Sequence, residues 1–383
     1  MIAAERKEAV LRELRLRGSL AVAEFSDRIG ISPVTLRRDL ADLEQAGHLT
    51  RVHGGATSVR PSHAEPRGTR STQQLAAAFG LAPRGPAGAT TVATIGMIVP
   101  TRRYYYASII EGAQSAAKLA DVRLILAISE YDEVEERRMF ERMLSLGLDG
   151  ILITPARSTL AESPLRELIE RARIPVTVLE RVWDFPVRGR VVDSVRSDHG
   201  YGGALGARHL AELGHRRIAL WSFANPHVEE ITAGFAAAAA ETGCEVHESS
   251  FDFGHPDWSD DDAMRNVRRY VDEALGTGVT GLVVHPDEVA MQVMGAALDR
   301  GVDVPRELSI IAYDDEVASL GELPLTAISP PKRAIGFAAI DACLRAVAHA
   351  GPGVEDFPAQ RIRLLPTLRE RESSGPPPGR PVT

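Results

Sequence analysis

Short, nearly continuous apolar runs recur along the last three quarters of this 383-residue chain. Each run is rich in β-branched residues, and longer amphipathic stretches such as residues 107–119 and 133–146 lie between the runs. Strands without a polar face are typical of parallel sheets that helices cover on both sides. The alternation therefore predicts right-handed crossovers and a doubly wound α/β sheet. The expected strands are residues 91–99, 123–128, 150–154, 175–179, 217–222, 280–285 and 308–313.

Segments of different composition divide the chain. A chain of this length usually needs more than one core, and so many strand–helix units favour two lobes with a cleft between them. Residues 58–90 are rich in Pro, Gly, Ser and Thr, as linkers are, and the end of the chain is rich in proline. We expect a helix-rich domain at residues 1–57, a linker at 58–90, a two-lobed α/β domain at 91–371 and a disordered tail at 372–383.

The composition favours a cytoplasmic protein that does not enter a membrane. No apolar run reaches the roughly 18 residues of a membrane span, and the first twenty residues lack the apolar stretch of a signal peptide. Cys244 and Cys343 are too few for a disulfide framework and read as small buried apolar residues. The net charge of −8 argues against a protein that coats nucleic acid along its whole surface. Residues 1–60 hold 10 Arg and Lys against 8 Asp and Glu, so a DNA-binding head on an acidic body is permitted.

The first 57 residues have the pattern of a helix-turn-helix. Apolar spacing predicts helices at residues 6–17 and 22–29, and Gly30 suits the left-handed end of the second. Ser32 is the expected N-cap of a third helix and Pro33 its first residue. Residues 49–52, a His-Gly-Gly turn and the residues that follow predict a two-stranded wing.

The third helix has one apolar and one polar face. Leu36, Leu40 and Leu43 fall at helical spacing and are expected to be buried, which leaves threonine and two adjacent arginines facing outward. Hydroxyl and guanidinium groups at the start of such a helix suit the major groove of DNA. The arginines could instead pair with acidic neighbours on a solvated helix. The DNA-contacting candidates are Ser32, Val34, Thr35, Arg37, Arg38, Arg51 and His53.

The stretch from residue 5 to 56 resembles the DeoR-type DNA-binding domain. The matching elements are ISPVTLRRDLADLEQAG, which forms the expected third helix, and the wing RVHGGA. The resemblance runs through the whole head without a gap. It implies sequence-specific binding to double-stranded operator DNA, usually by a dimer or a larger assembly.

The remainder of the chain resembles the effector domain of LacI-type regulators rather than the sugar-phosphate sensor that usually follows a DeoR-type head. The similarity extends from about residue 91 to 368 and is carried by IGMIVP, LDGILITP, IPVTVLER, ARHLAELGHRRIAL, VPRELSIIAYDD and LPLTAISPP. It implies two lobes with the fold of type I periplasmic binding proteins and a small-molecule effector, most often a sugar, between them.

The LacI-type resemblance also implies which residues surround the effector. Aromatic side chains after the first strand would stack on a sugar ring, and aspartates after later strands would accept hydrogen bonds from its hydroxyl groups. Two of the aspartates could equally cap helices or hold the crossovers between lobes. The ligand-binding candidates are Arg103, Tyr104, Tyr105, Tyr106, Arg181, Asp198, Tyr201, Trp258, Asp287 and Asp314.

Three positions depart from the LacI-type pattern. Ile231 stands where such regulators usually place a ligand-gripping arginine, and Pro286 and Pro330 replace polar residues. These changes remove several groups that hold sugars. They leave open an unusual or less polar effector, and also a vestigial pocket in a body that serves only dimerisation.

Catalysis has little support in the sequence. The run from Gly200 to Gly206 resembles a dinucleotide loop, but Leu205 stands where the third glycine belongs. His209 and His215 lack a plausible third metal ligand, and we expect neither a metal nor a cofactor. The prediction is a repressor that binds operator DNA as a homodimer and responds to a carbohydrate. A sugar- or nucleoside-processing enzyme with a DNA-binding head is the remaining alternative.

Overall fold

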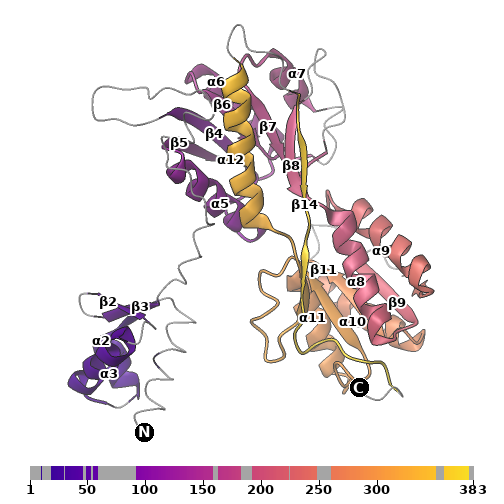
Figure 1. Cartoon of the computed structure of the whole chain (residues 1–383). Helices are drawn as coiled ribbons and strands as arrows, with labels where there is room; N and C mark the ends of the chain where they lie inside the picture. Colours follow the sequence, from indigo (N-terminus) through magenta and orange to yellow (C-terminus); the bar gives the residue numbers. More distant parts are fainter. Residues whose placement is uncertain are drawn as a thin grey trace. The chain divides into compact units, whose positions relative to one another are not determined.

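Figure 1 shows the computed structural model of the chain. It separates into two compact units, Met1–Ser71 and Thr72–Thr383, and each has its own apolar core. Among the described residues, no helix is long and apolar enough to cross a membrane. The residues that the structure describes are residue 10 and residues 19–29, 31–45, 49–52, 55–58, 92–157, 163–182, 192–223, 225–247, 260–350 and 358–378.

The described part of the first unit contains helices α2 and α3 and a small antiparallel sheet. Helix α2 (Val22–Ile29) and helix α3 (Pro33–Gln45) match the expected second and third helices. The expected wing is present as β2 (Leu49–Val52) and β3 (Gly55–Ser58), and a third strand that was not expected, β1 (Ser19–Ala21), pairs with β3. The expected first helix lies outside the described residues except for Val10. The core joins Val10, Val22, Phe25, Leu36, Leu40 and Leu43.

The second unit has two lobes. The sheet of the N-terminal lobe contains six parallel strands in the order β14-β8-β7-β6-β4-β5. Helices α5 and α12 pack on one face, and α6 and α7 pack on the other. The elements are β4 (Ala93–Val99), α5 (Tyr105–Leu119), β5 (Val122–Ile128), α6 (Glu133–Ser145), β6 (Gly150–Ile153), α7 (Pro164–Arg171), β7 (Val176–Leu179), β8 (Asp193–Ser197), α12 (Lys332–His349) and β14 (Arg361–Leu364).

The C-terminal lobe repeats this plan. Its sheet has the order β10-β9-β11-β12-β13-β15, in which only the pairing of β13 with β15 is antiparallel. Helices α10 and α11 cover one face, and α8 and α9 cover the other. The elements are α8 (His199–Leu213), β9 (Arg217–Ser222), α9 (Val228–Thr242), β10 (Glu245–His247), α10 (Asp260–Gly276), β11 (Gly281–His285), α11 (Asp287–Leu298), β12 (Ser309–Tyr313), β13 (Thr326–Ser329) and β15 (Thr367–Arg369).

The chain passes between the lobes three times, after β8, after β13 and after β14. Helix α12, coloured yellow-orange in Figure 1, therefore belongs to the N-terminal lobe although it follows β13 of the C-terminal lobe, and the chain returns to the C-terminal lobe for β15. All seven strands expected from the sequence are present, and their ends agree within two residues. The doubly wound α/β architecture is confirmed.

The end of the chain corrects one prediction. We expected residues 372–383 to be disordered, but residues 372–378 pack against the C-terminal lobe. The buried Ser373 hydroxyl donates to the carbonyl oxygen of Ile310 (2.5 Å) and accepts from the backbone N–H of Thr326 (2.8 Å). The proline-rich composition indicated disorder, but these hydrogen bonds to β12 and β13 hold the segment in place. Residues 379–383 lie outside the described residues.

Glycines allow two pairs of helices to pack with their backbones in close approach. In the N-terminal lobe, a Cβ atom at Gly112 of α5 would overlap the carbonyl group of Arg333, and one at Gly336 of α12 would overlap the carbonyl group of Ile109. In the C-terminal lobe, Gly234 of α9 lies in the same way against the carbonyl group of Gly200. Backbone atoms cannot move aside as a flexible side chain can, so these positions require glycine.

We predict that Gly336→Ala lowers the free energy of unfolding by about 1–3 kcal/mol, because the added methyl group pushes α5 and α12 apart. Gly295→Ala is the matched control, since it lies in helix α11 with nothing within 4 Å of the added Cβ. That change should raise the free energy of unfolding by about 0.5–1 kcal/mol. Urea-induced unfolding measures both. Equal effects of the two substitutions would contradict this view of the helix packing.

Candidate functional site

The outer face of α3 presents the residues expected to contact DNA. Val34 is 73% exposed, Arg37 and Arg38 are exposed, and Thr35 is half-buried. The opposite face carries Leu36, Leu40 and Leu43, which are buried in the head's core as expected. The helix therefore presents a row of one apolar side chain and two guanidinium groups to the surroundings.

The start of α3 is capped as the sequence predicts. The backbone N–H of Thr35 donates to the Ser32 hydroxyl oxygen (3.1 Å), and the two hydroxyl groups lie 2.8 Å apart. The cap fixes the first turn, where the positive end of the helix dipole favours a phosphate. The side chain of Arg51 and the whole of His53 lie outside the described residues, so their predicted DNA contacts stay predictions.

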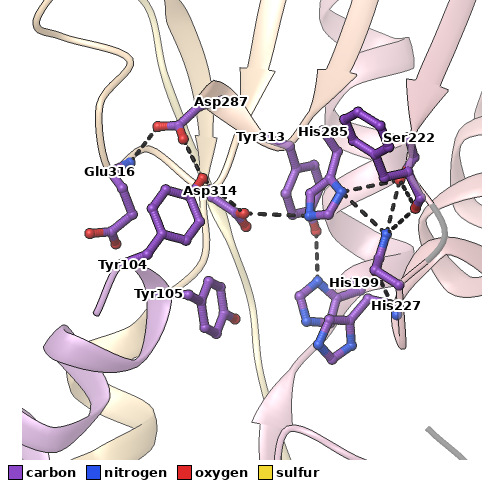
Figure 2. Close-up of polar contacts among 12 residues, drawn as sticks. Tyr104, Tyr105, His199, Ser222, His227, His285, Asp287, Tyr313, Asp314 and Glu316 are labelled. Carbon is purple, nitrogen blue, oxygen red and sulfur yellow. Dashed lines mark hydrogen bonds and ion pairs between the residues drawn. The ribbon is translucent and has the colours of Figure 1, made fainter. Parts of the chain in front are cut away.

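A second group of polar residues lies where the strands of the two lobes end (Figure 2). Tyr104, which precedes α5 in the N-terminal lobe, donates from its hydroxyl group to Oδ1 of Asp287 and lies 3.3 Å from Oδ2 of Asp314. Asp287 follows β11 and Asp314 follows β12, and both belong to the C-terminal lobe. The structure thus brings together three of the ligand-binding candidates across the two lobes. We refer to them and the residues that contact them as the interlobe cluster.

Asp287 also has a structural task. Its second oxygen, Oδ2, accepts from the backbone N–H groups of Glu316 (2.6 Å), Val317 (2.6 Å) and Ala318 (3.0 Å). Its side chain is 0% exposed, so these bonds offset the cost of burying the carboxylate. The loop after β12 is therefore held by the same side chain that contacts Tyr104.

Asp314 is bonded on the other side to a histidine. Oδ2 of Asp314 lies 3.4 Å from Nε2 of His285, whose Nδ1 lies 3.1 Å from the Ser222 hydroxyl and 3.3 Å from Nδ2 of Asn225. Burial alone would raise the pKa of Asp314, but His285 and then Lys332 outweigh it and lower that pKa. Asp314 is thus held as a charged acceptor.

Serine, histidine and aspartate in this order suggest a catalytic triad, but Ser222 also has two partners outside it. The Ser222 hydroxyl donates to the carbonyl oxygen of Phe223 (3.2 Å) and accepts from Nδ2 of Asn225 (3.1 Å). A nucleophilic serine gives its proton to the histidine, whereas the Ser222 hydroxyl divides its contacts among His285, Phe223 and Asn225. The arrangement therefore fits a polar binding network.

Glu180, His199 and His227 adjoin these residues through Tyr313, whose ring contacts that of His285, and we include them in the interlobe cluster. Glu180 is 0% exposed; it accepts from the Tyr105 hydroxyl (3.1 Å) and lies 3.3 Å from Nε2 of His199. Nδ1 of His199 lies 3.1 Å from the Tyr313 hydroxyl. Burial, with smaller effects of His199 and of nearby arginines, lowers the pKa of His227 well below its ordinary value.

These three residues carry potential metal-ligating atoms within 4.8 Å of one another. However, the rings of His199 and His227 stack with their centroids 3.9 Å apart. Two imidazoles that share a tetrahedral metal ion at bond lengths near 2.0 Å hold their centroids about 5 Å apart. The trio therefore has the geometry of a hydrogen-bonded glutamate–histidine pair with a stacked second histidine.

The other ligand-binding candidates have varied surroundings. Tyr105 and Tyr106 are buried in the N-terminal lobe, and Arg103 and Tyr201 are exposed. Arg181 is buried and donates to the carbonyl oxygens of Glu180 (2.7 Å) and Arg157 (3.3 Å). Asp198 caps α8 by accepting from the N–H of Tyr201 (2.9 Å), which is the structural role left open for it. Trp258 lies outside the described residues.

Several residues of the interlobe cluster were missed from the sequence. Glu180, His199 and His285 each stand at a strand end or a helix start, so the rule that ligands bind beyond strand ends could have found them. Lys332, at the start of α12, donates to the backbone oxygen of Asp314 and pairs with Glu316. No sequence signal singled out Lys332, because its partners lie in another lobe.

The positions that depart from the LacI-type pattern are buried or part of the backbone frame. Ile231 is 0% exposed and packs in the core beneath α8 and α9. Pro286 precedes the first residue of α11, and Pro330 is buried at the crossover that follows β13. Each thus serves packing or chain direction in this protein.

Comparisons with known proteins match the N-terminal head and the two-lobed body of the chain separately. A model of the DeoR-like helix-turn-helix domain matches residues 6–62, and a model of the periplasmic binding protein-like domain matches residues 207–374. The chain therefore joins a DeoR-like helix-turn-helix head to a periplasmic binding protein-like domain and is a transcription regulator. The ribose operon repressor of Escherichia coli is 28% identical over 291 residues, which cover 73% of this chain and 82% of that protein. The repressor PurR of Photobacterium profundum is 27% identical over 264 residues, or 67% of this chain and 75% of that one.

Solved structures show the same fold. The transcription regulator GntR from Chromobacterium violaceum is 25% identical with a TM-score of 0.59, and the match covers 73% of this regulator and 99% of that chain. A LacI family regulator from Enterococcus faecium, solved with bound ribose, is 23% identical with a TM-score of 0.58 and coverages of 74% and 99%. The two-lobed fold of the regulator is therefore confirmed.

The lowered pKa of His227 gives a pH prediction. The unfolded histidine, with its ordinary pKa near 6.5, takes up a proton before the folded one does, so the regulator loses stability as the pH falls below about 6.5. His227→Gln removes this contribution. Between about pH 7.5 and 5.5 the wild type should lose more free energy of unfolding than the variant, by on the order of 1 kcal/mol.

Urea-induced unfolding at both pH values measures this difference. His247→Gln is the control. Nε2 of His247 lies 3.0 Å from Oε1 of Glu273, and this pair is not part of the interlobe cluster. Parallel pH dependence of the wild type and His227→Gln would show that His227 is not held neutral by the fold.

Proposed function

We propose that this regulator is a repressor that binds operator DNA through α3 and releases it when a hydroxyl-rich small molecule, most simply a sugar, binds between its lobes. The observation that carries the proposal is the pair of buried carboxylates, Asp287 and Asp314, which lie close enough to accept from a single hydroxyl group, that of Tyr104. Carboxylates in this position suit the vicinal hydroxyl groups of a sugar. The solved relatives with bound ribose support the same class of ligand.

We infer that a regulator that binds operator DNA acts in the cytoplasm and as a homodimer. Operators usually have two-fold symmetry, and a symmetric dimer presents two heads at a fixed spacing. A change in the arrangement of the lobes would then alter the spacing of the heads. Such coupling requires an effector that binds one arrangement more tightly than the other.

A second function is a DNA-binding protein whose body only assembles dimers. It is favoured by Ile231, which is buried in the core where LacI-type regulators usually place an arginine toward the ligand. Saturable binding of a small molecule to the body would remove this alternative. Turnover of such a molecule would instead favour an enzyme.

We predict that Arg38→Ala weakens operator binding by about 1–3 kcal/mol if its guanidinium group reads a base. The loss should be larger on the operator than on unrelated DNA. Arg137→Ala in α6, an exposed arginine that pairs with Glu141, controls for the loss of one positive charge. A uniform loss over all DNA sequences, with a shallower salt dependence, would assign Arg38 to a phosphate.

The proposed function is tested by fluorescence anisotropy on DNA from directly upstream of the regulator's own gene. Sugars, sugar phosphates and nucleosides are titrated into the complex at fixed, near-physiological salt. We expect specific binding and release by one class of compound. Tight binding that no compound alters would support the assembly function, and absence of specific binding would mean that the operator lies elsewhere in the genome or that the head does not bind DNA.

A further inference from the structure

Tyr104 belongs to the N-terminal lobe, but its hydroxyl group reaches the C-terminal lobe. The residue precedes α5 with φ 50° and ψ −129°, and its side chain makes no capping bond to that helix. A positive φ is uncommon for a residue with a Cβ, and such strain persists only where other contacts fix it. The contacts of the Tyr104 hydroxyl with Asp287 and Asp314 are of this kind.

The two carboxylates offer few oxygen atoms to a ligand while Tyr104 is in place. Oδ2 of Asp287 is occupied by three backbone N–H groups, and Oδ1 accepts from Tyr104. Oδ2 of Asp314 lies between Tyr104 and His285. Burial, followed by the charges of Asp314 and Asp287, raises the pKa of Tyr104, so the phenol remains a neutral donor.

An effector hydroxyl that bonds to these carboxylates would have to take the place of the phenol. Both groups are neutral oxygen donors of similar size, and they would use the same acceptor atoms. A hydrogen bond to a buried charge is strong, and leaving the charge without a partner is costly. The exchange of one hydroxyl for the other keeps the carboxylates satisfied throughout.

We propose that the Tyr104 hydroxyl is an internal ligand, which holds the two lobes together in the free regulator and must be displaced before an effector hydroxyl can reach Asp287 and Asp314. This inference rests on the proposed function for its effector. Tyr104 would then lower the affinity of the regulator for its effector, because the phenol and the effector hydroxyl compete for the same carboxylates. An aromatic residue that only stacked on a bound sugar would use its ring and not its hydroxyl group.

The test compares Tyr104→Phe with Tyr105→Phe in the full-length regulator. Both substitutions remove one phenol hydroxyl, but the Tyr105 hydroxyl donates to Glu180 and does not contact the two aspartates. Spin labels are attached at Val134→Cys in α6 and Leu298→Cys in α11, which are exposed positions on different lobes. The native Cys244 and Cys343 are buried and free, so they should not be labelled. Labelled chains are diluted with unlabelled regulator, so that only distances within one chain are measured.

We expect the distance between the labels, measured by pulsed electron spin resonance without ligand, to broaden or lengthen in Tyr104→Phe and to remain at the wild-type value in Tyr105→Phe. Equal distance distributions in the two variants would overturn the proposal. A thermal unfolding midpoint for each variant confirms that the chain is folded.

Titration with D-ribose provides the second measurement. If the Tyr104 hydroxyl competes with the sugar, the affinity of Tyr104→Phe for ribose should be at least about tenfold higher than that of the wild type. In the variant, no hydrogen bond from residue 104 to Asp287 and Asp314 has to break before ribose binds. Ribose affinity that falls in Tyr104→Phe would overturn the competition. If no variant binds ribose, the proposed function loses that ligand, while the label distances still decide whether Tyr104 holds the lobes.

Discussion

The arrangement of the interlobe cluster depends on the hydrogen bonds that the buried carboxylate of Asp287 accepts. One of its oxygens orders the loop after β12 through three backbone N–H groups, and the other meets a hydroxyl from the opposite lobe. A charge that is fully buried must be compensated, and here the compensation comes from both lobes. A ligand hydroxyl that bonds to Asp287 or Asp314 in place of Tyr104 would therefore change a contact that joins the lobes, as the proposed sensor function requires.

The sequence predicts the framework well because the framework depends on local patterns. Apolar runs placed all seven expected strands within two residues, and helical spacing placed Leu36, Leu40 and Leu43 in the core of the head. Ser32 was recognised as the cap of α3 because capping depends on the next three residues. The short strand β1 and the ordered segment 372–378 were missed, since each is held by residues that are distant in sequence.

The candidate site was only half predictable for the same reason. Tyr104, Asp287 and Asp314 follow strands, so the topology of the fold pointed to them. Glu180, His199 and Lys332 gain their importance from partners in other elements, such as the Tyr105 and Tyr313 hydroxyls and the backbone of Asp314. Asp198 illustrates the opposite case, because its place after a strand suggested a ligand while its side chain caps α8.

The central claim is that one chain couples operator binding to ligand binding. Thermodynamic linkage makes this coupling reciprocal, so the most direct measurement is the affinity of the regulator for the proposed sugar effector with and without saturating operator DNA. The account predicts that operator DNA weakens sugar binding by the same factor by which the sugar weakens operator binding. A sugar affinity that operator DNA leaves unchanged would contradict it.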